Sequence, residues 1–379
     1  MKTLLRRFLL IAFFITPIVL LINYSFISKA KDKPDLQNKS SKTASKSEKK
    51  IEDQEITLTF SGDTMFDWQL RPIIEKNGAD YPFQHVKEEI KKADISFVNL
   101  ESAFTTKEKK APGQLFWIKS DPSTLQAIKN TGYDIVNIGN NHTLDYGQDG
   151  LLDTISHVEK LKFPYIGAGK NAKDAYTARE MTVKGKKFKF LSFVRFMPDS
   201  NWVAGENKPG VANGYDLNLV TKIIKEQKQD ADYLIVYMHW GVEKSNRPVE
   251  YQKQYVPKMV EAGANAIVGS HPHWLQGFEY YNKVPIAYSL GNFLFPSYVN
   301  GKSAETGVLT LTFKGKDVQM SFNPYIIRNN QVSPVNEEEK KKALQYLQTI
   351  STDVEIDDTG KINETRRLKI YFSVIYFTE

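Results

Sequence analysis

Short apolar runs alternate with stretches of helical periodicity from residue 55 onward. Strands are predicted where β-branched and aromatic residues run together, at 56–60 (ITLTF), 95–100 (ISFVNL), 133–138 (YDIVNI), 233–238 (YLIVYM) and 266–269 (AIVG). Helices are predicted over 83–92, 148–161, 217–229 and 250–262, with one more that opens at Asp121–Pro122 and closes at Gly132. This alternation of strands and helices is typical of an α/β fold.

Strands without intervening helices dominate the later part of the chain. Residues 179–196 predict a hairpin that turns at Lys184–Gly185. The segments 279–290, 308–313 and 318–327 are predicted as successive antiparallel strands. Parallel units followed by an antiparallel half predict two packed mixed β-sheets flanked by helices.

The first 54 residues differ from the rest. A short basic head precedes about 20 mostly apolar residues, Phe8 to Ile27, which is enough to cross a bilayer as one helix. The stretch that follows is rich in Lys and Ser and lacks an apolar period, as expected of a solvated tether. The predicted organisation is a membrane anchor at 1–28, a linker at 29–54, the main domain at 55–335, and a C-terminal helix and strand at 336–379 packed on that domain.

Local signals around the apolar stretch point in different directions. Ser28-Lys29-Ala30 resembles a cleavage site, but the apolar stretch is longer than a usual signal core, so we expect an uncleaved anchor. Lysines follow the stretch as well as precede it, although long domains are translocated regardless of such charges. We therefore expect a single-pass protein with the bulk of the chain extracytoplasmic.

Charge and cysteine content narrow the function classes. Residues 1–50 hold 11 Lys and Arg against 3 Asp and Glu, which leaves 40 and 41 of the totals of 51 and 44 for the rest of the chain. The folded part is nearly neutral, so the net charge of +7 does not predict nucleic-acid binding. The absence of cysteine excludes disulfides, thiolate catalysis and Cys-ligated metals.

Polar side chains stand at the ends of the predicted strands. Since ligands gather at the carboxyl ends of strands in α/β sheets, we expect these residues to converge. They supply carboxylates, imidazoles and carboxamides: Asp63, Glu101, Asn141, His142, His239, His271, His273 and Asn292. His271 and His273 point the same way if the strand remains extended through both residues. His85 and His157 lie on predicted helices and are interpreted as ordinary surface histidines.

Oxygen and nitrogen ligands without sulfur suit Mn²⁺, Zn²⁺ or Fe. Two such ions bridged by a carboxylate generate hydroxide at neutral pH and clamp the oxygens of a phosphoryl or acyl group. Several alternatives stay open at this stage. Asn137, Asn140 and Asn292 also suit turns, and Trp117, Trp240 and Trp274 suit either a substrate groove or the core.

Six ordered blocks carry a resemblance to a known family. GDTM, NLESAFT, NIGNNHTLDYGQDGLLDT, HWGVE, GSHPHWLQGFE and YSLGNFLF fall across roughly residues 57–296. In this order they resemble the CapA family of capsule or poly-γ-glutamate synthesis proteins, whose domain is similar to calcineurin-like metallophosphoesterases. The resemblance implies a metallophosphoesterase-like αββα sandwich.

The resemblance also implies roles for individual residues. It makes Asp63 and His273 ligands of a first ion, Glu101 the bridging ligand, and Asn141, His239 and His271 ligands of a second. It makes His142 a general acid supported by Asp145, and it suggests a substrate contact by Arg71. Trp240 and Asn292 are further candidates for substrate contacts from their residue types and positions alone. The chain departs from the phosphoesterase pattern because Thr64 and Met65 follow Asp63 without a histidine, and because glutamate replaces aspartate at the bridge. One ion or two are consistent with these changes.

Three functions follow from the sequence. The first is a membrane-anchored component of poly-γ-glutamate or capsule biosynthesis, export or attachment, with an anionic surface polymer and a membrane-bound synthase complex as partners. The second is a metal-dependent hydrolase, a phosphoesterase or polymer amidase, unrelated to capsule. The third is a non-catalytic component that binds an anionic polymer.

Overall fold

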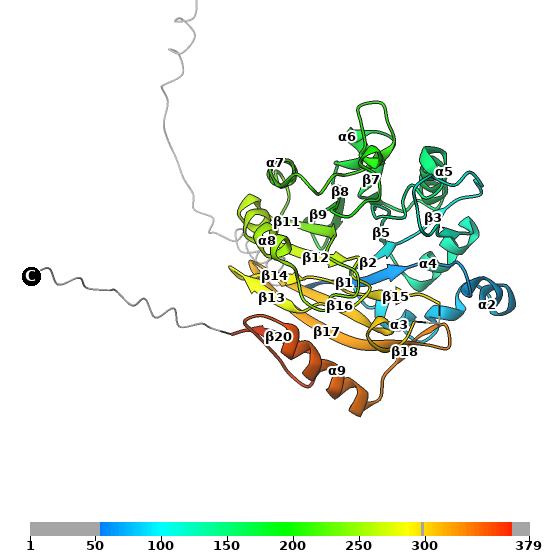
Figure 1. The fold of residues 1–379 in the computed structure, drawn as a ribbon. Coiled ribbons are helices and arrows are strands. Elements are labelled where there is room, and N and C mark those ends of the chain that lie inside the picture. The colour runs from blue at the N-terminus through cyan, green and yellow to red at the C-terminus, as the bar shows by residue number, and fades with distance from the viewer. Residues whose placement is uncertain (1–53, 297–298, 366–379) are drawn as a thin grey trace, which may run out of the picture. The chain divides into compact units, whose positions relative to one another are not determined.

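A computed structural model describes residues 54–296 and 299–365 of the chain (Figure 1). The larger sheet has the order β19-β20-β17-β16-β1-β2-β5-β6, with β15 also paired to β1 and β18 to β17. Its strands are β1 (Ile56–Thr64), β2 (Ile95–Leu100), β5 (Ile135–Asn137), β6 (Tyr165–Ile166), β15 (Asn292–Leu294), β16 (Glu305–Lys314), β17 (Asp317–Arg328), β18 (Gln331–Pro334), β19 (Val354–Ile356) and β20 (Lys361–Glu364). Within it β1, β2, β5 and β6 run parallel, whereas β16 and β17 run antiparallel.

The second sheet has the order β13-β14-β12-β11-β9-β8. Its strands are β8 (Arg179–Val183), β9 (Lys186–Val194), β11 (Tyr233–His239), β12 (Ala266–Ser270), β13 (Phe278–Tyr281) and β14 (Val284–Ala287). Two small ribbons pair β3 (Ala103–Phe104) with β4 (Lys119–Ser120), and β7 (Ala168–Gly169) with β10 (Gly210–Val211).

The two sheets pack face to face through aromatic side chains. Phe97 of β2 contacts Phe190 of β9 and Tyr237 of β11, with ring centroids 6.4 Å and 4.7 Å apart. All three side chains are buried, and removing a ring of this size from a core costs about 3–5 kcal/mol. This inter-sheet core fixes the relative position of the strand ends that carry the polar residues.

Helices cover the outer faces of both sheets (Figure 1). The larger sheet carries α2 (Leu70–Asn77), α3 (Lys87–Ile90), α4 (Leu125–Thr131) and α5 (Gly147–Lys160), and the second carries α6 (Ala172–Ala175), α7 (Leu217–Gln227) and α8 (Glu250–Ala262). The last helix, α9 (Glu337–Ile350), packs its buried leucines into the inter-sheet core. Short 3-10 turns occupy Tyr81–Phe83, Pro122–Thr124, Ser200–Trp202 and Gly301–Ser303.

The structure confirms the prediction of a mixed α/β fold with packed sheets flanked by helices. The helix predicted over 83–92 is wrong in extent, because only Lys87–Ile90 is α-helical. Val86 donates its amide to Phe83 O, so successive turns replace a continuous helical ladder. The single strand predicted at 279–290 is wrong, because the chain turns at Asn282 and Lys283, both with positive φ, and forms two antiparallel strands, β13 and β14. β14 also runs parallel to β12.

The predicted membrane anchor, the linker up to residue 53 and the chain after residue 365 lie outside the described residues. Among 54–296 and 299–365, no helix has the length and apolarity needed to cross a bilayer.

Candidate metal centre

The carboxyl ends of strands from both sheets meet at one place. Asp63 lies near the end of β1, Glu101 directly follows β2, and His239 ends β11. The register pairs Asp63 with Asn99 of β2 and with Asn292 of β15, and pairs His239 with Ser270 of β12. These neighbouring strand ends bring together side chains that are far apart in the sequence.

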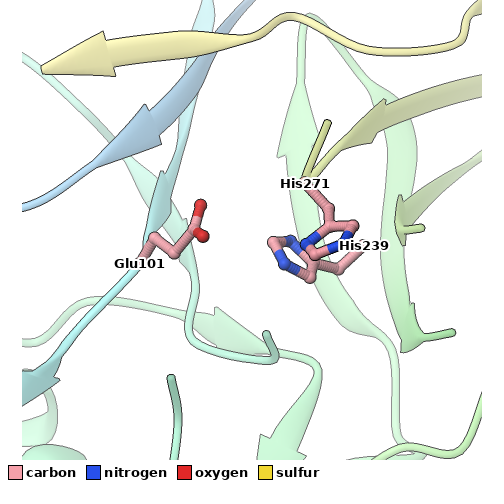
Figure 2. Close-up of side chains that lie close together, drawn as sticks. All are labelled: Glu101, His239 and His271. Carbon is pink, nitrogen blue, oxygen red and sulfur yellow. The ribbon is translucent and has the colours of Figure 1, made fainter. Parts of the chain in front are cut away.

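Two groups of three potential ligands share one carboxylate. Glu101, His239 and His271 form the first group, in which the ligand atoms all lie within 4.8 Å of one another. Figure 2 shows the Glu101 carboxylate on one side and the two imidazoles facing it from the other. Asp63, Glu101 and His273 form the second group by the same measure. Glu101 therefore has the position of a bridging ligand between two cations.

Buried polar atoms in the centre lack the partners that such atoms normally have. Both ring nitrogens of His271 and Oε1 of Glu101 are buried without a hydrogen bond. Leaving a buried polar atom unpaired costs about 1–3 kcal/mol, and most are paired in native proteins. A cation coordinated by one His271 nitrogen and by Glu101 Oε1 removes the penalty of those two atoms, so the residues present fit a divalent metal ion.

The pKa shifts of the residues in the centre also fit a bound metal ion. Burial, followed by the neighbouring charge of Asp63, raises the pKa of Glu101 well above its usual range. Burial also lowers the pKa of His239 and of His271 well below the usual range, with the nearby imidazoles adding to the effect. Both imidazoles are therefore neutral at pH 7, which is the form that binds metals.

His271 and His273 come together through a turn and not through an extended strand. β12 ends at Ser270, and both histidines have positive φ, 100° for His271 and 56° for His273. The extended backbone from which we predicted that the two side chains point the same way is wrong, although their ring centroids lie 6.1 Å apart. Left-handed conformations in non-glycine residues cost of order 1–3 kcal/mol and cluster at functional sites.

Carboxamides and a hydroxyl hold the ligands in place. Asn99 donates from Nδ2 to Asp63 Oδ1 at 2.7 Å, and Asn137 in turn donates to Asn99 Oδ1 at 2.7 Å. His239 has Ser270 Oγ 3.1 Å from Nδ1 and Asn141 Oδ1 2.6 Å from Nε2. Such contacts orient metal ligands and select the imidazole tautomer. Asn141 thus contacts the candidate ligand His239 directly.

The predicted acid pair is in contact at the edge of the centre. His142 Nδ1 lies 2.8 Å from Asp145 Oδ2, and the imidazole is partly exposed whereas the carboxylate is buried. Asp145 Oδ2 also accepts the Ile118 amide at 2.7 Å. Burial raises the pKa of Asp145, and the bond to His142 opposes that rise. A histidine oriented in this way presents Nε2 for proton transfer.

The three residues predicted to contact substrate have other surroundings. Arg71 Nε binds Asp67 at 2.6 Å and its Nη2 binds Lys119 O, so its charge is already paired. The indole of Trp240 is fully buried in the helix-covered core and donates to Tyr288 O, and this places it away from solvent. Asn292 is buried and bonds His273 Nδ1 at 2.8 Å, which leaves Nε2 of that ring toward Glu101.

Sequence reasoning missed two residues of the centre. Asn99 stands two residues before Glu101, so strand alternation places both on one face, and this spacing was a usable signal. Phe196 stacks on the His271 ring with centroids 4.3 Å apart. No residue pattern marks Phe196, because it lies two residues beyond β9 in a loop.

Comparisons with known proteins bear on the family that the six sequence blocks resemble. The family model described as bacterial capsule synthesis protein PGA_cap matches residues 57–297. The chain is 34% identical over 251 residues to "Capsule biosynthesis protein CapA" of Bacillus anthracis, covering 64% of this chain and 61% of that protein. It is 33% identical over 249 residues to "PGA biosynthesis protein CapA" of Bacillus subtilis (strain 168), covering 65% of each. The match thus spans less than two thirds of these relatives.

Solved structures give a weaker likeness. The calcineurin-like phosphoesterase YfkN from Bacillus subtilis aligns with a TM-score of 0.43 and 16% identity, over 78% of this chain and 97% of that one. The family model, in contrast, covers more than half of the chain and includes every candidate ligand. The chain therefore belongs to the bacterial capsule synthesis family described as PGA_cap.

Proposed function

We propose that this protein is a membrane-anchored, extracytoplasmic component of capsule or poly-γ-glutamate production, and that its buried strand-end cluster binds one or two divalent ions. The names of the relatives support the polymer role, and the apolar run Phe8 to Ile27 supports the anchor. Two face-packed sheets with ligands at strand ends support a metallophosphoesterase-like sandwich. The observation that carries the metal part is the pair of unpartnered His271 ring nitrogens facing Glu101.

The chain's own residues divide between two ion positions. Asp63, Glu101 and His273 would hold one ion, and Glu101, His239 and His271 would hold the other, with Asn141 Oδ1 beside them. The residues after Asp63 add no ligand, because Thr64 bonds Gly62 O and Met65 packs in a hydrophobic cluster. The first position is therefore the poorer one, and Mn²⁺, Zn²⁺ or Fe²⁺ suits this donor set.

A bound ion supplies a Lewis acid that polarises a phosphoryl or acyl oxygen and lowers the pKa of water. The protein supplies the remaining functions. Asp145 holds His142 with Nδ1 occupied, so Nε2 can deliver a proton to a leaving group. Phe196 covers one face of His271 and limits the access of water to that ligand.

A metal-dependent hydrolase is the second candidate, and the contact between His142 and Asp145 favours it. Its substrate would be a phosphoester or a γ-linked glutamyl polymer. The hydrolase and the capsule role are compatible, because a hydrolase can trim or transfer polymer.

Metal content tests the first part of the proposal. We expect the full chain, purified in detergent and incubated with Mn²⁺ or Zn²⁺, to retain about one or two ions per chain after gel filtration. His271→Ala should lose most of the bound metal, whereas His85→Ala, at an exposed histidine, should keep it. A wild-type chain that retains no ion would overturn the metal assignment.

Activity and cell-surface polymer test the rest. His142→Ala should keep the metal and lose about 10²- to 10⁴-fold in turnover on a phosphoester or a γ-linked glutamyl substrate. Polymer that binds equally well to His142→Ala, with no turnover by the wild type, would favour a non-catalytic binding role. A gene deletion that leaves the amount, length and attachment of surface polymer unchanged would contradict the capsule role.

A further inference from the structure

The loop that joins β3 to β4, residues 105–118, carries an apolar tip in water. Leu115 is 87% exposed and Phe116 is 65% exposed, the two highest values among the large hydrophobic side chains that the structure describes. They are neighbours in the chain, so they form one protruding surface. The ring of Trp68 lies against Phe116 in an edge-on arrangement, with centroids 6.3 Å apart. A projecting apolar pair of this kind marks an interaction site more often than an isolated exposed residue does.

The base of this loop is fixed to the domain by polar contacts. Thr105 Oγ1 and the Thr106 amide bind Asp153 Oδ2 at 2.7 Å and 2.9 Å. The Trp117 indole donates to Ala111 O at 2.8 Å, which closes the loop on itself. The tip is therefore presented by a structured loop and not by a free chain end.

The same loop is positively charged. Residues 105–119 contain four lysines and one glutamate, and Lys119 pairs with that glutamate, Glu108. The other three, Lys107, Lys109 and Lys110, are exposed. No carboxylate among the described residues forms an ion pair with any of these three. Lys110 Nζ lies over the Trp117 ring of the same loop, 4.7 Å from its centroid. The tip thus combines apolar side chains with cations that no carboxylate neutralises.

We infer that loop 105–118 docks on the surface of an anionic lipid bilayer, with Leu115 and Phe116 inserted between the lipids and the three lysines at the headgroups. An apolar tip next to basic residues is the composition that interfacial membrane contacts use. A soluble anionic polymer would pair with the lysines but offers little apolar surface to the two side chains at the tip. The charge and the exposed apolar pair together favour lipid.

The inferred docking rests on the membrane location in the proposed function and is independent of the metal chemistry. The length of the chain before the domain allows the loop to contact the bilayer. β1 begins at Ile56, and its nine residues lead to the edge with the candidate centre, about 30 Å away. Residues 29–53 can span at most about 80–90 Å, so an anchor before them permits the loop to reach the bilayer.

Docking would place the candidate centre at the membrane surface. The Asp145 carboxylate binds both the Ile118 amide at the loop base and the His142 ring. Ala111 N also donates to Asp145 O at 2.8 Å. The tip is therefore connected to the candidate acid by a short path of hydrogen bonds, and an anionic polymer emerging at the bilayer would meet the centre there.

The absence of cysteine makes a site-specific label straightforward. An environment-sensitive dye is attached to the new cysteine of Phe116→Cys in the full chain. The labelled protein is reconstituted either in vesicles of phosphatidylglycerol and phosphatidylcholine or in vesicles of phosphatidylcholine alone. Lys316→Cys is the matched control, because this exposed turn follows Phe313, which pairs with Ile56 at the opposite end of β1. Flotation of the vesicles tests the anchor separately.

We expect blue-shifted emission and strong quenching by nitroxide lipids for the label at position 116 in anionic vesicles, and neither for the label at 316. Replacing Lys107, Lys109 and Lys110 by Gln should weaken the contact about fivefold per lysine. If Phe116→Cys alters the melting temperature, Leu115→Cys replaces it. A label at 116 that floats with the vesicles but stays accessible to aqueous iodide overturns the inference. Protection by soluble poly-γ-glutamate without lipid would assign the loop to polymer and also overturn it.

Discussion

Replacing Glu101 by Gln should have opposite effects on the stability of the metal-free and the metal-bound protein. Without an ion, the carboxyl group is fully buried, its Oε1 has no hydrogen bond, and Asp63 lies beside it. A neutral amide of the same shape has no charge to lose, whereas the wild-type carboxylate must take up a proton as the chain folds near pH 7. Each unit by which the folded pKa exceeds the unfolded pKa corresponds to about 1.4 kcal/mol, so we expect the metal-free variant to be more stable than the wild type by about 1–3 kcal/mol near pH 7.

The difference in stability between Glu101→Gln and the wild type should depend on pH with a defined sign. The Glu101 carboxyl has an ordinary pKa of 4.5 when unfolded, and burial raises its pKa in the folded chain. Its contribution to wild-type stability is fully present below the unfolded pKa and is lost as pH rises through the folded pKa. The advantage of Glu101→Gln in metal-free protein should therefore be absent below about pH 4.5 and grow as the pH rises above it.

Bound metal should make the wild type more stable than Glu101→Gln. A ligand at 100 times its Kd stabilises the folded state by about 2.7 kcal/mol, and the wild type should gain this while the variant gains much less. Glu101 belongs to both ligand groups, so its amide weakens both. Urea unfolding followed by circular dichroism, with EDTA or with saturating Mn²⁺, measures the two orders. Glu206→Gln, at an exposed glutamate, should match the wild type in both conditions.

Two results would refute this reasoning. If Glu101→Gln is less stable than the wild type in EDTA by the same amount as in Mn²⁺, the carboxylate has a purely structural role. If Mn²⁺ stabilises the variant and the wild type equally, Glu101 is not a ligand.

Three further predictions follow from the centre and its scaffold. Asn99→Ala should lower metal affinity about 10- to 100-fold in calorimetric titration, because it releases Asp63 Oδ1, and an unchanged Kd would contradict this role. Metal affinity should rise with pH by up to about tenfold per pH unit below the folded pKa of Glu101, because metal binding displaces the proton of that carboxyl group. Calorimetric titration in buffers of different ionisation enthalpy would detect the released proton. A pH-independent Kd would contradict the displacement. Gly62→Ala should destabilise the fold by more than about 3 kcal/mol in urea unfolding, because the added Cβ would lie 2.1 Å from Gly291 O. The control Gly315→Ala, at an open turn, should cost about 1 kcal/mol. Equal effects of the two substitutions would contradict the close approach of the backbone at Gly62.

The long buried strands could be predicted because burial on both faces leaves little choice of residue. β2 has the bounds predicted from ISFVNL, and α8 has the predicted bounds Glu250–Ala262. The hairpin at Lys184–Gly185 was predictable from the need for positive φ at both turn residues, which the structure has. Two-residue strands such as β3 and β10 leave no periodicity to read, so the ribbons that they form depend on tertiary contacts.

The candidate-site residues that stand at the ends of strands could be predicted from the sequence. Trp240 shows where that reasoning stops: it follows His239 by one residue, so strand alternation turns it to the opposite face, into the core. Arg71 stands four residues after Asp67, and the two side chains pair across the start of α2, because Asp67 lies in the turn before the helix. The turn that unites His271 and His273 depends on positive φ at two histidines, which the sequence does not reveal.

The pKa shifts in the centre have a common explanation. Glu101 is pushed toward its protonated form, while His239 and His271 are held neutral. A metal-free centre thus carries less charge than its composition suggests, because the protein interior penalises each charged form. A divalent cation reverses only the shift of Glu101, since the imidazoles are already in the form that binds. One proton then leaves as one ion enters, and Glu101, shared by both ligand groups, is the residue through which ion binding, pH and folding stability are linked.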